Sequence, residues 1–376
     1  MSTFSVTNTN NSGLGSLRQQ ILNADLAGGT NIINFGGLFD DGLAHTINLT
    51  GSSLRITDHL TIQGTNPSLL TIKDDTADRV FDIGKGATSA INRLTITNTY
   101  DGANGGGGIS NEGILTLSDS IIKGNTVSDQ INTHAPVGVA SFAGEGSEGG
   151  GILNTGSLTV NHSTIIDNRA AYGGGIYNTG SLTVNHSTIT DNRAFVGGGI
   201  DNTRSIDNTG RLTVNYSAVT DNSADYEGGG IFTNSNLSLS YKSSITTVSY
   251  STISGNQASD GGGIDSSNFS YLVVDNSTIT SNNANNYGGG IEESFSYLVV
   301  DNSTITSNKA YDDAGGIYKF NSNQYTEYNS RIYNNSPDNV VSMVDKLVHP
   351  SNLQLEVLTI NSPPFLGKIR AVQSAQ

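Results

Sequence analysis

The sequence predicts an all-β protein built as a solenoid, in which short strands stack coil upon coil into three parallel sheets. Three observations predict this class: a recurring Gly-Gly-Gly-Ile motif, a recurring Ser-Thr-Ile-x-x-Asn motif that keeps step with it, and an unusual composition. The 376 residues include 46 Gly, and 14% of them are charged. Glycine is a poor helix former, so this composition opposes a helical bundle. The absence of Cys excludes a disulfide-stapled scaffold and a cysteine zinc site.

The glycine motif sets the length of one coil. Six copies begin at Gly149, Gly173, Gly197, Gly228, Gly261 and Gly288, and a seventh, with alanine first, begins at Ala314. Successive copies are 24, 24, 31, 33, 27 and 26 residues apart, so the basic unit has about 24 residues and accepts insertions. The second motif begins at Ser163, Ser187, Ser251, Ser277 and Ser303. Repetition at a period of this size is typical of solenoids.

Each unit contains three short strand segments. In the copy that begins at Gly173 they lie around Ile176, Leu182–Val184 and Ile189, separated by Gly, Asn and Ser, which favour turns. Strands this short bury too little surface alone, so they must stack on identical neighbours about 4.8 Å away. Equivalent isoleucines then fill a narrow core. Equivalent asparagines form an internal amide ladder, which consists of Asn125, Asn168, Asn192, Asn222, Asn256, Asn282, Asn308 and Asn335.

The chain divides into four parts along this solenoid. Residues 1–30 hold an N-terminal strand and a capping helix, because Ser16 is a suitable N-cap and Leu17 and Ile21 share one apolar face. Residues 31–104 hold strand-like runs without the glycine motif, which we expect to form irregular first coils. Residues 105–336 form the regular coils, and residues 337–376 form a C-terminal cap and tail.

The paired motifs resemble those of a known superfamily. Over residues 105–340, Gly-Gly-Gly-Ile with Ile-x-x-Asn is similar to the right-handed parallel β-helix superfamily of the pectate lyases. In repeat type it looks most like polymorphic outer-membrane-protein and autotransporter-like bacterial surface proteins. Those repeats carry an aromatic residue where Ser163 or Thr164 stands and alanine at the third glycine, so the likeness is one of type. The resemblance implies a right-handed solenoid in a secreted or cell-surface bacterial protein.

Charge and hydropathy exclude two classes of partner. The formal net charge of −15 opposes nucleic-acid binding, because it would repel the phosphates. No run of 18 apolar residues is present, so no membrane-spanning helix is expected. Residues Met1–Phe4 lack the basic start and apolar run of a signal peptide, so secretion requires a signal removed from this chain or another export route.

Two positions beside the glycine motif vary toward acids and aromatics, and they suggest a binding face. After the inward isoleucine stand Leu153, Tyr177, Asp201, Phe232, Asp265, Glu292 and Tyr318. Before the glycines stand Glu148, Tyr172, Val196, Glu227, Asp260, Tyr287 and Asp313. Rings cover the C–H faces of sugars and carboxylates accept their hydroxyl hydrogens, so a glycan fits. We expect the contacts from Tyr172, Tyr177, Tyr226, Phe232, Tyr287 and Tyr318. The plainer alternative is that acids keep the surface soluble and tyrosine simply suits strands.

These observations leave three functions open. The first is a structural or adhesive protein that presents the acidic and aromatic face to a polysaccharide or a cell-surface glycan. The second is a polysaccharide lyase or glycoside hydrolase, in which Asp201 with Glu227, or Asp265 with Glu292, supplies the carboxylate pair. No Gly-His-Gly motif of the polygalacturonases accompanies them. The third is a stalk segment of a longer secreted protein.

No cofactor is required by these hypotheses, but two groups of residues suggest metal chemistry. Asp260, Asp265, Glu292 and Glu293 would crowd adjacent coils, and oxygen ligands of this kind favour Ca²⁺. Coil twist and water could equally keep these carboxylates apart. His162 and His186 occupy equivalent places on neighbouring coils, which suggests a metal pair. An exposed strand end explains the histidines better, because later coils carry other residues there.

Overall fold

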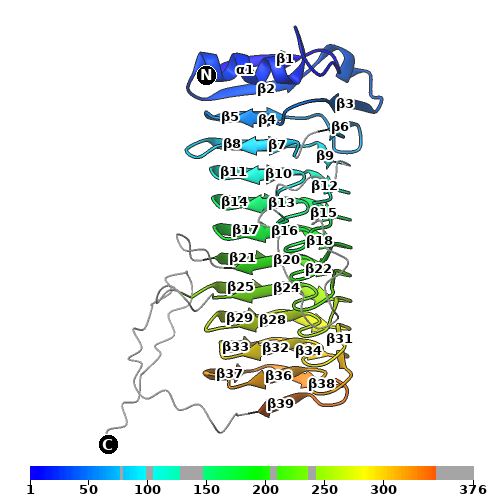
Figure 1. Cartoon of the computed structure of the whole chain (residues 1–376), viewed down its shortest axis with the longest axis vertical. Helices are drawn as coiled ribbons and strands as arrows, with labels where there is room; N and C mark the ends of the chain where they lie inside the picture. Colours follow the sequence, from blue (N-terminus) through cyan, green and yellow to red (C-terminus); the bar gives the residue numbers. More distant parts are fainter. Residues whose placement is uncertain (77–78, 99–104, 128–146, 204–209, 236–242, 344–376) are drawn as a thin grey trace, which may run out of the picture. The chain divides into compact units, whose positions relative to one another are not determined.

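Three long parallel sheets carry the fold (Figure 1). The computed structural model describes residues 1–76, 79–98, 105–127, 147–203, 210–235 and 243–343, and every element below lies in the unit Met1–Val344. Sheet 1 contains the isoleucine of the glycine motif. Its 11 strands are β4 (Leu54–Ile56), β7 (Phe81–Ile83), β10 (Ile109–Asn111), β13 (Ile152–Asn154), β16 (Ile176–Asn178), β20 (Ile200–Thr203), β24 (Ile231–Asn234), β28 (Ile264–Ser267), β32 (Ile291–Ser294), β36 (Ile317–Phe320) and β39 (Val340–Met343).

The other two long sheets follow sheet 1 in each coil. Sheet 2 has 12 strands: β1 (Ser2–Val6), β2 (Asn31–Phe35), β5 (Leu60–Gln63), β8 (Thr88–Asn92), β11 (Ile114–Ser118), β14 (Ser157–Asn161), β17 (Ser181–Asn185), β21 (Arg211–Asn215), β25 (Ile245–Ser249), β29 (Tyr271–Asp275), β33 (Tyr297–Asp301) and β37 (Gln324–Tyr328). Sheet 3 has 11 strands: β3 (His45–Leu49), β6 (Leu70–Asp74), β9 (Thr95–Asn98), β12 (Ile121–Lys123), β15 (Thr164–Ile166), β18 (Thr188–Thr190), β22 (Ala218–Thr220), β26 (Thr252–Ser254), β30 (Thr278–Thr280), β34 (Thr304–Thr306) and β38 (Arg331–Tyr333).

The register of the coils is the predicted one. Ile176 pairs in parallel with Ile152 on one side and with Ile200 on the other. All three side chains are fully buried, so equivalent isoleucines form one continuous apolar column inside the solenoid. The prediction of a parallel β-solenoid with three sheets is therefore confirmed.

A fourth, narrow sheet was not predicted. Its five strands of two residues each are β19 (Arg193–Ala194), β23 (Ser223–Ala224), β27 (Gln257–Ala258), β31 (Asn283–Ala284) and β35 (Lys309–Ala310). Each directly follows a ladder asparagine and ends on a small alanine, which is buried in all but β35. A two-residue strand is too short to show an alternating pattern, so periodicity alone does not reveal it.

The asparagine ladder forms as predicted. The side-chain amide of Asn168 donates to the Oδ1 atom of Asn192 at 2.9 Å, and the backbone N–H of Asn168 donates to the same atom at 3.0 Å. The Asn192 amide also donates to the carbonyl oxygen of Ile165 at 3.0 Å. Each buried amide thus joins its own coil to the next, which satisfies polar groups that would otherwise destabilise the core.

A second amide ladder runs inside sheet 1 and was not predicted. The side chains of Asn111, Asn154, Asn178 and Asn202 donate in sequence, each to the Oδ1 atom of the next at 2.7 Å. Each stands two residues after the inward isoleucine and so points to the same, interior face. In later coils the register places Thr233, Ser266, Glu293 and Lys319 at this position.

A helix and a short 3₁₀ turn (η1, Gly37–Asp40) accompany the first coils. Helix α1 (Leu17–Ala27) begins at Ser16, whose hydroxyl accepts from the backbone N–H of Gln19 at 3.2 Å. Leu17, Ile21 and Ala24 are buried, and α1 contacts β1, β2 and β4 (Figure 1). The helix therefore covers the apolar interior where the stack begins. No helix in the described part of the chain is long and apolar enough to cross a membrane.

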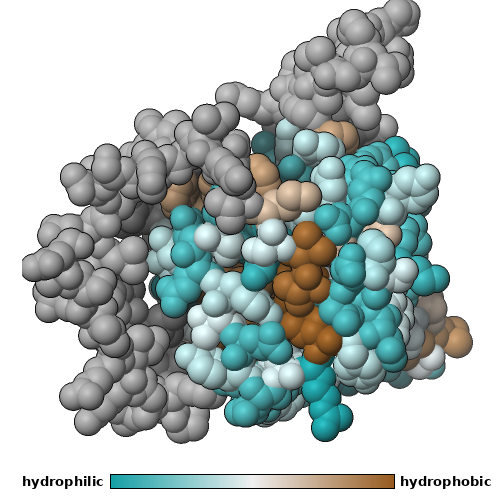
Figure 2. Space-filling view, turned by 90° about the horizontal axis from the view of Figure 1, so that it is seen from below, coloured by the Kyte–Doolittle hydropathy of each residue, from teal (hydrophilic) through white to brown (hydrophobic). Residues whose placement is uncertain are grey.

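Within the described residues, the interior is less well covered at the opposite end of the solenoid. Ile332 and Tyr325 belong to the last coil and are less buried than their equivalents, and Met343 at the end of β39 is 48% exposed. Viewed from this end, Figure 2 shows a hydrophobic patch bordered by hydrophilic side chains. The predicted C-terminal cap and tail at 337–376 lies outside the described residues beyond residue 343.

Candidate functional site

Five carboxyl side chains come together on the outer face of sheet 1 and beside the starts of its strands: Asp201, Glu227, Asp260, Asp265 and Glu292. We call them the acidic strip. Asp201, Asp265 and Glu292 are the outward residues of β20, β28 and β32, and the ring of Phe232 stands between them on β24. Glu227 and Asp260 directly precede glycine motifs and pair with each other as a parallel bridge.

The first glycine of each motif brings these two rows together. Gly197 has φ +66, and a Cβ atom there would lie 2.7 Å from the Cβ atom of Asp201. The same holds for Gly261 against Asp265, again at 2.7 Å. The chain therefore turns back tightly against its own strand, in a left-handed conformation that glycine adopts most easily and that Ala314 adopts in the last copy. The residue before the motif comes to lie beside the outward residue of the strand.

Four of the seven outward residues are buried, contrary to the expectation of an open face. Asp201 is 1% exposed, Asp265 2%, Phe232 5% and Tyr318 6%. Glu227, Asp260, Glu292 and Tyr287 keep part of their surface exposed. The tight turn at each glycine accounts for this difference, because it packs against the strand face that period-two alternation alone would leave open to water.

Each outward carboxyl accepts a hydrogen bond from a hydroxyl two residues further along the same strand. Thr203 donates to Asp201, Ser267 donates to Asp265 at 2.6 Å, and Ser294 donates to Glu292 at 3.1 Å. In the other row, Asp260 accepts from the backbone N–H of Tyr287 at 3.3 Å. The Oε2 atom of Glu292 is buried and has no hydrogen-bond partner among the described residues.

Burial makes every carboxyl of the strip a weaker acid than usual. Desolvation, with the charges of Glu227 and Glu148, raises the pKa of Asp201 to about 8 against the hydrogen bond from Thr203. Desolvation and the charge of Asp260 raise the pKa of Glu227 to about 7. Desolvation raises the pKa of Glu292 to about 8 and also raises the pKa values of Asp260 and Asp265. Near neutral pH the strip therefore holds several protons.

Both carboxyl pairs that the sequence proposed as catalytic are brought together. The charge of Glu227 contributes to the raised pKa of Asp201, and the charge of Glu292 contributes to the raised pKa of Asp265. The register places Asp265 opposite Glu292 on adjacent strands.

Aromatic rings lie at both ends of the strip. Tyr172 meets Tyr177 edge to face at one end, with ring centroids 6.5 Å apart. Tyr287 and Tyr318 stack at the other end, 4.6 Å apart. Tyr226 is 46% exposed and stacks on Phe195 at 5.5 Å. The charge of Glu227 raises the pKa of Tyr226, which places this residue beside the strip as well.

The predicted calcium set is wrong in one member. Glu293 follows Glu292 directly and therefore points to the other face of β32, into the interior, where it is 0% exposed. Its Oε1 atom accepts from the backbone N–H of Ser296 at 2.8 Å and from the Ser296 hydroxyl at 3.0 Å. Strand alternation thus separates it from Asp260, Asp265 and Glu292. Among the described residues, no three His, Asp or Glu side chains are placed to hold a metal ion.

The histidine pair belongs to a longer row of rings. His162 stacks on His186 at 5.0 Å, His186 on Tyr216 at 5.2 Å, and Tyr216 on Tyr250 at 4.9 Å. In the sequence, the two histidines are identical residues at one position of the repeat, whereas the tyrosines at the same position of the next two coils differ from them. In space the tyrosines continue the row.

Comparisons with known proteins reveal a likeness in architecture alone. No family model and no curated protein matches this chain. Among solved structures, the A-module of a mannuronan C-5 epimerase from Azotobacter vinelandii is similar, with 14% sequence identity and a TM-score of 0.48. The match covers 91% of this chain and 97% of that one. A likeness at this level carries no argument about function.

Proposed function

We propose that the acidic strip binds a polysaccharide, and that the chain is an extracellular or cell-surface binding protein. One observation carries the proposal: five carboxyls lie in two adjacent rows over consecutive coils, with Phe232 between Asp201 and Asp265 in the outward row and aromatic rings at both ends. A carboxyl that keeps its proton both donates to and accepts from a hydroxyl group, and the rings offer apolar faces to sugar C–H groups.

The polysaccharide that fits best is uncharged. When the strip ionises, it becomes a row of negative charge that repels a polyuronate. The protonated strip, by contrast, offers hydrogen bonds without net charge. Glu227, Asp260 and Tyr287 keep part of their surface exposed, so they are the groups that a sugar chain reaches first.

Binding to a panel of immobilised neutral and acidic polysaccharides tests this proposal. Replacing Tyr287 by alanine removes a ring that stacks at the end of the strip, and we expect affinity to fall about tenfold, as for other aromatic contacts in binding sites. Tyr311→Ala is the matched control, because Tyr311 is 86% exposed and belongs to no ring contact among the described residues. Failure to retain any polysaccharide would remove the proposal.

A second candidate function is polysaccharide cleavage, and the raised pKa values favour it. A general acid needs a pKa close to the working pH, and the pKa values of Glu227 and Asp201 lie at about 7 and about 8. Incubation with the same polysaccharides, followed by assays for reducing ends and unsaturated products, tests this function. If Glu227→Gln abolishes product release but keeps binding, the strip is catalytic. If the unaltered protein releases nothing, this candidate fails.

Calcium at the strip and a stalk role remain proposals of the same kind. Asp260, Asp265 and Glu292 are the members of the predicted calcium set that share the outer face of sheet 1. These three side chains are not already placed to hold a metal ion, so calcium would have to draw them together. A stalk role is supported only by the length and regularity of the stack. Finding the same coils joined to a catalytic or adhesive module in a longer chain would favour it over the first two functions.

A further inference from the structure

The row of rings formed by His162, His186, Tyr216 and Tyr250, which we call the aromatic stack, occupies a backbone position that disfavours aromatic residues. Their φ values are +47°, +48°, +47° and +49°. A left-handed backbone suits Gly, Asn and Asp, whereas a bulky residue there is strained. The next coils use Asn at this position, as at Asn276 and Asn302, each with φ +45°. The turn alone therefore does not require aromatic side chains, and the four coils that carry them need another explanation.

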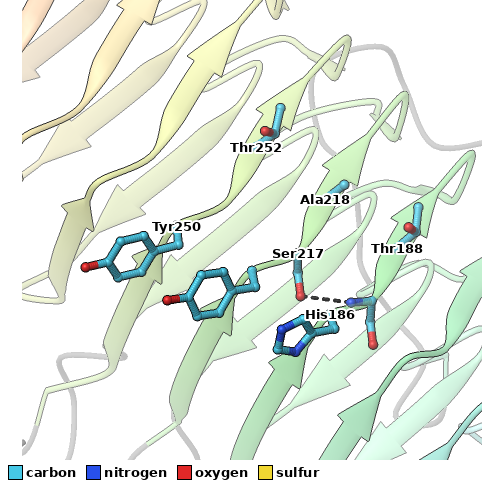
Figure 3. A pocket seen from close by; sticks show the side chains of 8 residues that line it. His186, Thr188, Ser217, Ala218, Tyr250 and Thr252 are labelled. Carbon is cyan, nitrogen blue, oxygen red and sulfur yellow. Dashed lines mark hydrogen bonds between the residues drawn. The ribbon is translucent and has the colours of Figure 1, made fainter.

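The aromatic stack borders a shallow groove, wide open to solvent, on the outside of sheet 3 (Figure 3). The groove has a volume of about 550 Å³ and is lined by His186, Ser187, Thr188, Tyr216, Ser217, Ala218, Tyr250 and Thr252. Figure 3 shows the rings in one row and Thr188, Ala218 and Thr252 in a second, parallel row. The groove crosses three consecutive coils about 4.8 Å apart, so it suits a chain-like ligand that runs along the stack.

Several polar groups along this groove are free to bind a ligand. The serines are already used, since Ser217 accepts from the backbone N–H of Ser187 at 3.1 Å and donates to the carbonyl of Asn215 at 2.8 Å. The hydroxyls of Thr188 and Thr252 make no hydrogen bond to any described residue. The same holds for the phenol groups of Tyr216 and Tyr250, which are 51% and 49% exposed.

Tyr250 is the last ring of the stack: one face of its ring stacks on Tyr216, and the other has no ring partner among the described residues. The following coil has Asn276 at the equivalent place, and the side chain of Asn276 turns aside to donate to Asp275 at 2.8 Å. The other rings stack on one another at centroid distances of 4.9 to 5.2 Å. An exposed ring face beside unused hydroxyls is the usual way in which proteins hold a sugar, because the face covers C–H groups and the hydroxyls pair with sugar oxygens.

Charge selects against an acidic sugar at this place. No lysine or arginine lines the groove. Asp167, Asp191 and Asp221 are exposed at the far ends of the neighbouring sheet 3 strands and add negative charge. From these contacts we infer that the groove beside the aromatic stack is a second binding site, which takes an uncharged oligosaccharide independently of the acidic strip.

Asparagine substitutions test this inference without disturbing the fold. Tyr216→Asn and Tyr250→Asn each install the residue that later coils carry at this backbone position, so both variants should fold and keep the wild-type thermal midpoint. Tyr311→Asn is the control at an exposed tyrosine outside the groove. The full chain and each variant are titrated with neutral gluco-, xylo-, manno- and galacto-configured hexasaccharides by calorimetry.

We expect the full chain and Tyr311→Asn to bind at least one hexasaccharide, and both stack variants to bind it about tenfold more weakly. The chain has six histidines, so a sample with isotopically labelled histidine gives a direct second readout by NMR. The ring signals of His162 and His186 should shift on binding, and those of His45 and His59 should stay.

Equal binding by the stack variants, or a bound hexasaccharide that leaves the His162 and His186 signals in place, would overturn the inference. If Tyr287→Ala loses binding and the stack variants keep it, the inference also fails, because the hexasaccharide then binds at the acidic strip and not beside the aromatic stack. Absence of binding to all four hexasaccharides would also overturn it.

Discussion

Replacing Asp201 by asparagine should stabilise the protein, and the gain should depend on pH. Asp201 is 1% exposed, and its pKa is raised from 3.8 to about 8. Between these values the folded protein holds a proton that the unfolded chain releases. The folded state thus binds more protons, so its stability falls as the pH rises from about 4 to about 8. Asparagine keeps the shape of the carboxyl and can still accept from Thr203, but it has no proton to lose.

The size of the effect follows from the distance between the two pKa values. A pH of 7 lies about three units above the pKa of Asp201 in the unfolded chain, so the carboxyl is ionised there but still protonated in the folded protein. Each pH unit corresponds to about 1.4 kcal/mol. The free energy of unfolding of Asp201→Asn should therefore exceed that of the wild type by about 4 kcal/mol at pH 7. At pH 4 the difference should be near zero, and above pH 8 it should stop growing.

Urea unfolding followed by far-ultraviolet circular dichroism, at each pH from 4 to 9, measures this difference. Asp191→Asn is the matched control, because Asp191 is an exposed aspartate in a turn of the same solenoid. A gain that is the same at pH 4 and pH 8 would refute the reasoning, since it would show that the carboxyl is not held protonated. A loss of stability at every pH would show that an asparagine side chain cannot fill the place of the acid.

Three further predictions concern the stability of the solenoid and the binding of calcium to the acidic strip. Asn192→Ala should lower the free energy of unfolding by about 2–4 kcal/mol in urea, because two buried donors of Asn168 lose their acceptor, whereas Asn185→Ala, outside the interior, should cost less than about 1 kcal/mol. Gly174→Ala should lower the thermal midpoint strongly, because a Cβ atom there would lie 2.5 Å from two carbonyl oxygens. Gly84→Ala is the control, because the nearest atom to its Cβ would be 3.4 Å away, and it should change the midpoint little. Equal effects of the two substitutions would contradict the close contact of neighbouring coils at Gly174. Calcium should leave the thermal midpoint unchanged at pH 6, where the acidic strip holds its protons, and raise it at pH 9; no rise at pH 9 would argue against a calcium site.

The architecture was accessible from the sequence because repetition reveals register. Matching isoleucines and asparagines recur in step, so their columns follow once the coils are assumed to stack, and the pairing of Ile176 with Ile152 and Ile200 bears this out. The second ladder was missed because Ile-x-Asn recurs from Asn111 to Asn202 and then gives way to other residues. A pattern confined to a few coils is hard to separate from chance.

The site was only partly accessible for a different reason. Proximity of acids on adjacent coils follows from the register, which is enough to predict that Asp265 lies beside Glu292. Burial depends on how the chain turns at each glycine, which a repeat period does not reveal. Adjacency in sequence groups Glu293 with Glu292, although alternation along a strand points the two side chains to opposite faces. Strict use of that alternation excludes Glu293 from the calcium set.

The central claim is that the acidic strip binds an uncharged polysaccharide through carboxyls that keep their protons near neutral pH. Calorimetric titration of the full chain with a neutral polysaccharide from the panel, at pH 6 and at pH 9, tests it most directly. The claim predicts binding at pH 6 that weakens by about tenfold or more at pH 9, as the groups with pKa values of about 7 and about 8 ionise. Equal affinity at both values, or binding that appears only at pH 9, would contradict it.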